Sequence, residues 1–119
     1  MSLDGLAEMT PLQQYILLGA ASLELEGNET FQSYDVRDYC VAHLDRLHED
    51  PFEGGITREA VIRALSKLEG KRYVETEFDE RSPVGKGRPS YRLAVETDSL
   101  LDELGQLPLF ADLVADVGA

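Results

Sequence analysis

Hydrophobic residues recur at helical spacing in three segments of the first 70 residues. The first segment begins after Thr10, a suitable N-cap, with Pro11 at the first helical position, and it ends at Gly27. Its apolar residues occupy nearly the whole circumference, so this helix must be covered on more than one side. The second segment follows the candidate cap Ser33 and continues to Leu47, with apolar residues on one face and aspartates on the other. The pattern predicts two helices that differ in how much of their surface is buried.

The third segment, "TREAVIRALSKLEG", has the clearest helical pattern in the chain. Thr57 is the expected N-cap, and Gly70 is expected to end the helix. Ile56 and Val61 occupy the two positions of a hydrophobic staple. The opposite face is of mixed polarity, unlike the acidic faces of the earlier helices. The expected buried stripe consists of Ala60, Val61, Ala64, Leu65 and Leu68.

Two later segments alternate between apolar and polar residues, as half-buried strands do. Residues 71–78 and 90–95 are joined by the glycine- and proline-rich residues 79–89, which predicts a β-hairpin with a long connection. In the first strand, Tyr73 is expected on the same face as the glutamates. Residues 29–32 are a candidate short strand ahead of the second helix.

The C-terminal residues are predicted to be helical again. Thr97 and Asp98 form a capping pair for a helix that contains three leucines. A second short helix is expected after Pro108. The order of elements is therefore helix, short strand, helix, helix, strand, long loop, strand and two further helices.

The size and composition suit one small domain. The chain has 119 residues, of which 43% are hydrophobic, enough for a single modest core. Its apolar runs are far shorter than the roughly 18 residues that cross a bilayer, and no signal peptide is recognisable, so no membrane partner is expected. Cys40 has no second cysteine to pair with, which favours a cytoplasmic location and predicts a small core residue.

The residue pattern contains no recognisable catalytic or metal site. His43 lies within an apolar stripe and is expected to be structural, and neither it nor His48 has a second ligand at metal-binding spacing. No Ser/His/Asp, Cys/His or P-loop arrangement occurs. We therefore expect no enzyme activity, no metal and no cofactor, and nothing in the sequence identifies a small-molecule effector.

Charge is unevenly distributed along the chain. Acidic residues outnumber basic ones 23 to 11, a formal net charge of −12 that suits a halophilic source, because concentrated salt screens the repulsion. Residues 1–57 contain 11 acidic and two basic residues, and residues 93–119 contain six acidic and no basic residues. Residues 58–92, by contrast, contain nine basic and six acidic residues. Such segregation of positive charge is typical of a nucleic-acid-binding surface.

The predicted order of elements is that of a winged helix-turn-helix: an α+β, mainly α fold of three helices and a β-hairpin wing, followed here by a C-terminal helical extension. In this fold, the second helix of the pair enters the major groove, and the wing contacts backbone or minor groove. Residues 57–68 are the candidate reading helix, and residues 79–89 are the candidate wing, whose glycines allow close approach to phosphate. The predicted DNA-binding residues are Thr57, Arg58, Arg63, Ser66, Lys67, Arg81, Lys86, Gly87, Arg88 and Arg92.

The segment "ALSKLEGKRYVETEFDERSPVGKGRPSYRL" resembles the recognition-helix-to-wing segment of PadR-like transcriptional regulators. In those proteins a leucine-rich helix, an LE-x-x-x-hydrophobic-V join and a G-R-x-x-Y-x-L return strand recur. The chain also resembles the C-terminal winged-helix domain of archaeal origin-recognition initiator proteins. Either resemblance covers about residues 11–104; the length of residues 35–55 favours the initiators, and the absence of an ATPase domain favours the regulators unless the chain is a fragment. The resemblance places Arg63, Ser66 and Lys67 at base or phosphate contacts and Lys86 and Arg88 at the wing tip.

Three functions remain open from the sequence. The leading hypothesis is a small transcriptional regulator that binds double-stranded DNA as a homodimer. Dimerisation suits both the first helix, which is apolar nearly all round, and the apolar C-terminal segment, since two-fold symmetry doubles the contacts. The alternatives are a DNA-binding module of an archaeal replication-origin initiator and a winged-helix protein-interaction module that binds no DNA. The expected organisation is an N-terminal tail (1–9), a winged-helix domain (10–96) and a helical segment (97–119) for dimerisation or docking.

Overall fold

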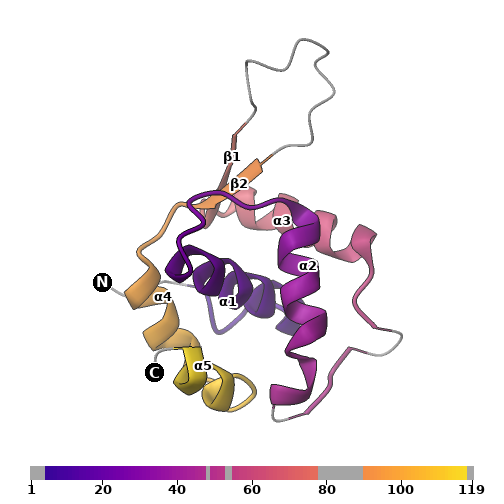
Figure 1. The fold of residues 1–119 in the computed structure, drawn as a ribbon, viewed down its shortest axis with the longest axis vertical. Helices are drawn as coiled ribbons and strands as arrows, with labels where there is room; N and C mark the ends of the chain where they lie inside the picture. Colours follow the sequence, from indigo (N-terminus) through magenta and orange to yellow (C-terminus); the bar gives the residue numbers. More distant parts are fainter. Residues whose placement is uncertain (1–4, 48, 53–54, 78–89, 118–119) are drawn as a thin grey trace.

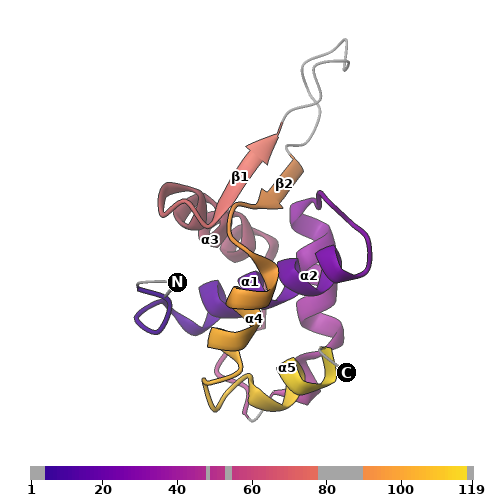
Figure 2. The same ribbon diagram turned by 90° about the vertical axis from the view of Figure 1, so that its left-hand side faces the viewer.

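The computed structural model describes residues 5–47, 49–52, 55–77 and 90–117. This part of the chain is α+β and mainly helical, with helices stacked around a central helix and a two-stranded hairpin rising from one end (Figures 1 and 2). None of its helices has both the length and the apolar character needed to cross a membrane. The elements are α1 (Pro11–Leu25), α2 (Ser33–Ala42), the 3₁₀ turn η1 (Leu44–Arg46), α3 (Arg58–Gly70), β1 (Val74–Glu77), β2 (Ser90–Leu93), α4 (Thr97–Leu104) and α5 (Ala111–Val117).

Helix α1 is the centre of the fold. It begins with the predicted Thr10 cap, whose hydroxyl accepts from the Gln13 backbone N–H at 3.2 Å, and Gln13 in turn accepts from the Thr10 N–H. Residues 13–22 are all buried, because α2, α3 and α4 of the same chain pack around them. A Cβ at Gly19 would lie 3.2 Å from the Tyr39 ring, so α1 and α2 approach closely there. The apolar circumference of α1 is therefore covered within one chain and provides no argument for a dimer.

Helix α2 starts one residue earlier and ends sooner than the sequence pattern indicates. Its N-cap is Gln32 rather than Ser33, because the Asp35 carboxylate accepts the Gln32 backbone N–H at 2.8 Å. The helix ends at Ala42, and the predicted continuation to Leu47 is instead the 3₁₀ turn η1. The aspartate that the sequence pattern placed on an exposed face thus serves as a capping residue.

The hairpin pairs β1 with β2 in antiparallel register, with Val74 opposite Leu93. The predicted strand at residues 29–32 is reduced to one bridge, in which Phe31 and Tyr91 exchange backbone hydrogen bonds of 2.9 and 2.7 Å. Their rings also lie 6.1 Å apart, so this bridge ties the segment before α2 to the hairpin. Glu75 faces solvent as predicted.

A Schellman turn closes α3 and leads into the hairpin. The Tyr73 N–H donates to the Leu68 carbonyl and the Arg72 N–H donates to the Glu69 carbonyl, with Arg72 in the left-handed region at φ +67°. Gly70 is the last helical residue, as predicted, but the left-handed position two residues later carries an arginine. The expectation that Tyr73 shares the glutamates' face was wrong: Tyr73 is buried, because it closes this turn instead of continuing the strand's alternation.

Arg72→Gly is expected to raise the free energy of unfolding by about 0.5–1 kcal/mol. A left-handed backbone costs a non-glycine residue about 1–2 kcal/mol, and glycine removes this strain. Part of the gain in stability is offset, because glycine makes the unfolded chain more flexible. Urea denaturation would measure the change, with Arg72→Ala as the control that removes the side chain but keeps the strain. Equal stability of the glycine and alanine variants would contradict this account.

The C-terminal helices contribute to the same core. The N-cap of α4 is Glu96, one residue before the predicted pair, and α4 packs along α1. Phe110, just before α5, is fully buried and stacks on Tyr15 with ring centroids 5.8 Å apart. Leu113 of α5 is also buried. Residues 97–117 are thus held against α1 of their own chain.

Candidate nucleic-acid interface

The exposed face of α3 brings together five of the predicted DNA-binding residues. The buried stripe of α3 matches the prediction at Val61, Ala64, Leu65 and Leu68, and it turns the other side of the helix to solvent. The Thr57 hydroxyl accepts from the Ala60 backbone N–H at 3.1 Å, so this predicted contact residue is also the N-cap. The exposed members of the predicted set on this helix and its cap are Thr57, Arg58, Arg63, Ser66 and Lys67.

The cations of α3 form no ion pair with any other described residue, whereas Arg46 and Arg92 do. Arg58 lies at the amino end of the helix, Arg63 in the middle and Lys67 in the last turn. Lys71 and Arg72 follow immediately and are exposed as well. Between residues 57 and 73 the chain carries five basic and two acidic residues. We call the exposed surface that carries these five basic residues the cationic strip. It is positively charged on a protein whose total charge is strongly negative.

Arg37 extends this surface and was missed by the sequence analysis. Its Nε donates to the Ile56 carbonyl at 3.0 Å, directly before the Thr57 cap. The contact places a guanidinium from α2 beside the amino end of α3. Arg37 lies in an acidic helix. It reaches this site through a contact between α2 and the start of α3, which joins residues 19 positions apart in the sequence.

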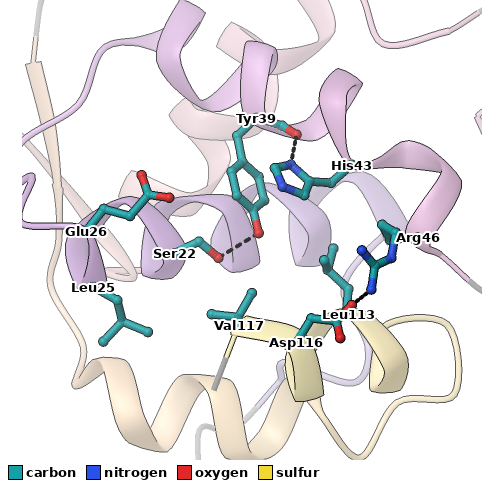
Figure 3. A pocket seen from close by; sticks show the side chains of 9 residues that line it. All are labelled: Ser22, Leu25, Glu26, Tyr39, His43, Arg46, Leu113, Asp116 and Val117. Carbon is teal, nitrogen blue, oxygen red and sulfur yellow. Dashed lines mark hydrogen bonds and ion pairs between the residues drawn. The ribbon is translucent and has the colours of Figure 1, made fainter. Parts of the chain in front are cut away.

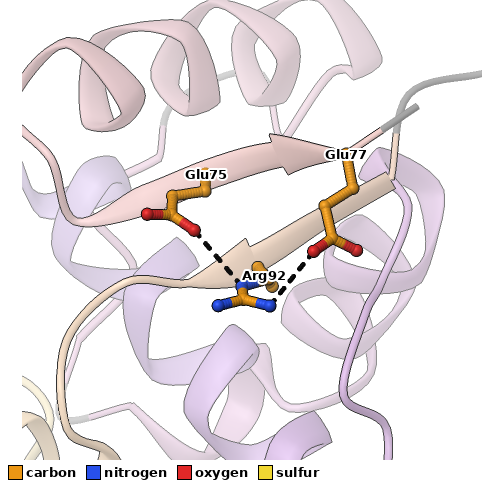
Figure 4. A network of polar contacts seen from close by, with 3 residues as sticks. All are labelled: Glu75, Glu77 and Arg92. Carbon is orange, nitrogen blue, oxygen red and sulfur yellow. Dashed lines mark hydrogen bonds and ion pairs between the residues drawn. The ribbon is translucent and has the colours of Figure 1, made fainter.

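Arg92 differs from the α3 cations because it is already paired. Figure 4 shows its guanidinium between two glutamates of the neighbouring strand, with Nε 3.3 Å from Glu75 and Nη1 3.1 Å from Glu77. All three side chains are about half exposed, so the pairs contribute little to stability. Their effect is electrostatic: two carboxylates offset one guanidinium on the exposed side of the hairpin. The remaining predicted contacts, Arg81, Lys86, Gly87 and Arg88, lie outside the described residues.

A second polar cluster lies in a hollow of about 350 Å³ between α1, α2 and α5 (Figure 3). Tyr39 and Ser22 are hydrogen-bonded at 2.8 Å, and the His43 ring stacks on Tyr39 with centroids 4.1 Å apart. Arg46 forms an ion pair with Asp116 of α5. His43 therefore has a packing role, and Arg46 is paired with α5 and adds nothing to the cationic strip. In the described part of the chain, no three His, Cys, Asp or Glu side chains are grouped to hold a metal ion.

The core next to this hollow holds three buried groups that stay protonated in the folded protein. Burial raises the pKa of Tyr15, whose hydroxyl donates to the Cys40 carbonyl at 2.5 Å. Burial likewise raises the pKa of the Cys40 thiol, which confirms the predicted core cysteine and leaves it unreactive. Burial also raises the pKa of Tyr39, although its hydrogen bond with Ser22 opposes the shift. These groups are structural and stay neutral in the folded protein.

The raised pKa values predict loss of stability in alkali. The unfolded chain releases these protons from about pH 8.5 for cysteine and about pH 10 for tyrosine, while the folded chain keeps them. The contribution of these groups to the free energy of unfolding is therefore fully present below about pH 8.5 and is lost as the pH rises further. Urea unfolding at pH 7, 9 and 10.5 would measure the decline, and Tyr15→Phe should make it shallower. A free energy of unfolding that stays constant to pH 10.5 would contradict the burial of these groups.

Comparison of the chain with protein-family models, with curated proteins and with solved structures found no match. The functional argument therefore depends on the geometry and charge described above.

Proposed function

We propose that this protein is a winged-helix protein that binds duplex DNA, with α3 in the major groove and the β1–β2 connection as the wing. The observation that carries the proposal is the cationic strip on the exposed face of α3, unpaired among the described residues. On a chain of net charge −12, free cations gathered on one helix favour a polyanionic partner. The element order α1, α2, α3, β1, β2, with Phe31 bridged to Tyr91, is compatible with this layout.

The dimensions of α3 suit the groove. A helix with its side chains is about 10–12 Å wide, and the major groove of B-DNA is about 12 Å wide. The buried stripe of this 13-residue helix faces the core, so the opposite, exposed side of α3 is free to enter a groove. Arg63 and Ser66, one turn apart, lie centrally on that side and are suited to base edges.

The amino end of α3 is suited to phosphate. Arg58 follows the Thr57 cap, and Arg37 of α2 donates to the Ile56 carbonyl directly before it. Backbone N–H groups at a helix N-terminus add a partial positive charge in the same place. We assign Arg37 and Arg58 to backbone contacts that position α3, and Lys67 to a third such contact at its other end.

Fluorescence anisotropy with labelled duplex DNA, read over a range of salt concentrations, tests this function. Each phosphate contact releases counterions, so log K should fall linearly with log salt at a slope of about −0.9 per contact. Contacts from Arg37, Arg58 and Lys67 alone predict a slope of about −2.7, and any further contact would make it steeper. Absence of binding to random and genomic duplexes at any salt concentration would contradict DNA binding and favour protein docking.

The pairing of Arg92 leads to a separate prediction. Replacing Glu75 and Glu77 together by glutamine should tighten DNA binding, because it frees Arg92 and removes two negative charges from the base of the hairpin. One new phosphate contact would steepen the salt slope by about 0.9. The matched control is Asp102→Asn with Asp112→Asn, which removes the same charge from exposed positions on α4 and α5. Equal tightening by both double variants would show that only net charge matters and would contradict a role for the hairpin.

The biological role is separable from DNA binding itself. The resemblance in residues 64–93 supports a transcriptional regulator, for which retained genomic fragments should come from promoters. Repeated origin elements among those fragments would instead indicate part of a replication initiator.

A further inference from the structure

An exposed isoleucine lies in the middle of the cationic strip. Ile62 of α3 keeps 39% of its surface accessible, although Leu65 and Leu68 of the same helix are fully buried. It lines a shallow hollow of about 370 Å³ together with Glu59, Arg63 and Ser66. Ile62 lies outside the hydrophobic core of the described residues, so the packing of α3 against α1 does not account for its apolar side chain.

The four residues of this hollow share one face of α3 because their spacing is that of successive helical turns. A base-reading face needs hydrogen-bonding groups and, where thymine is to be recognised, an apolar group. On the major-groove edges, thymine presents a C5 methyl group that the other bases lack. Ile62 is the apolar member of a set that otherwise carries a carboxylate, a guanidinium and a hydroxyl.

We propose that Ile62 is a specificity-determining residue that packs against the C5 methyl group of a thymine in the major groove. This inference rests on the proposed DNA-binding function and adds a base preference to it. The charge around Ile62 favours DNA over a protein surface. Arg63 beside it suits a base edge, and Arg58 and Lys67, nine residues apart and therefore on opposite edges of the exposed side, suit the phosphates that flank the groove. A protein interface would need a wider apolar patch than one side chain.

The contact has a property that separates it from the phosphate contacts. Burial of a methyl group does not depend on screening, whereas the phosphate contacts weaken steadily as salt rises. Discrimination for thymine should therefore persist at salt concentrations that weaken overall binding.

The test begins with selection of bound duplexes from a random library by the full chain. Each thymine of the selected site is then replaced by deoxyuridine, which removes only the methyl group. One such replacement should weaken binding by the wild-type protein about fourfold, the loss expected for one buried methyl group, at both low and high salt. Ile62→Ala should bind the thymine and deoxyuridine duplexes equally. Val41→Ala, at an exposed position of α2 with 49% accessibility, should keep the fourfold difference and serves as the matched control.

The outcomes distinguish the role of Ile62 from the proposed DNA-binding function on which it rests. If the wild-type protein binds no duplex, both proposals fail. If it binds but no deoxyuridine replacement matters, or if the selected site lacks thymine, only the role of Ile62 fails. Persistence of the fourfold difference in Ile62→Ala would also refute this role, because another residue would then read the methyl group.

Discussion

Replacing Leu65 by alanine is expected to lower the free energy of unfolding by about 2–5 kcal/mol, the usual cost of removing a fully buried leucine side chain. Leu65 is 0% exposed and lies on the stripe that joins α3 to α1, so its loss leaves a cavity at the centre of the fold. Urea denaturation with the linear extrapolation method would measure the change.

Ile62→Ala is the matched control, because it shortens an aliphatic side chain on the same helix at a position that is 39% exposed. Its stability should change by no more than about 0.5 kcal/mol. The pair determines which face of α3 is buried, and hence which face is available to DNA. Similar losses for both variants would mean that α3 is packed in another rotation and would remove the basis for the interface.

Replacing Arg63 by alanine is expected to weaken DNA binding about 10- to 100-fold, because a bidentate arginine contact to a base edge contributes about 1–3 kcal/mol of discrimination. Arg63 is exposed in the middle of α3 and forms no ion pair with another described residue. Anisotropy titrations with the selected duplex and with a shuffled duplex would show both the loss of affinity and the loss of preference between them.

Arg46→Ala is the control for that substitution, since it removes the same charge from a half-exposed side chain paired with Asp116 on another surface. Its effect on DNA binding should be small at physiological salt, where charges separated by more than about 8 Å are largely screened. If Arg46→Ala and Arg63→Ala weaken binding to the same extent, net charge and not position would govern affinity.

The helices were predictable because their signals are local. Thr10 and Thr57 each precede a segment of apolar periodicity, and both cap a helix in the structure. The hairpin followed from two alternating segments joined by glycine and proline. Where the prediction was wrong, a competing hydrogen bond decided the outcome. The Asp35 carboxylate moved the start of α2 to Gln32, and the backbone turn after α3 buried Tyr73.

The candidate interface was less predictable because it depends on contacts between distant residues. The cations of α3 could be placed from helical spacing alone. The position of Arg37 depends on a hydrogen bond to Ile56, and the pairing of Arg92 depends on the strand register that puts it opposite Glu75. The dimer argument from α1 lost its basis for the same reason, since helical spacing shows that a surface is apolar and does not show what covers it.

The most direct test of the central claim is an NMR titration of the ¹⁵N-labelled protein with duplex DNA. The account predicts that the largest amide shift changes fall on the exposed side of α3, from Arg58 to Lys67, and at Arg37 of α2, while α4 and α5 change little. Changes concentrated around Arg46 and Asp116, with α3 unaffected, would contradict it.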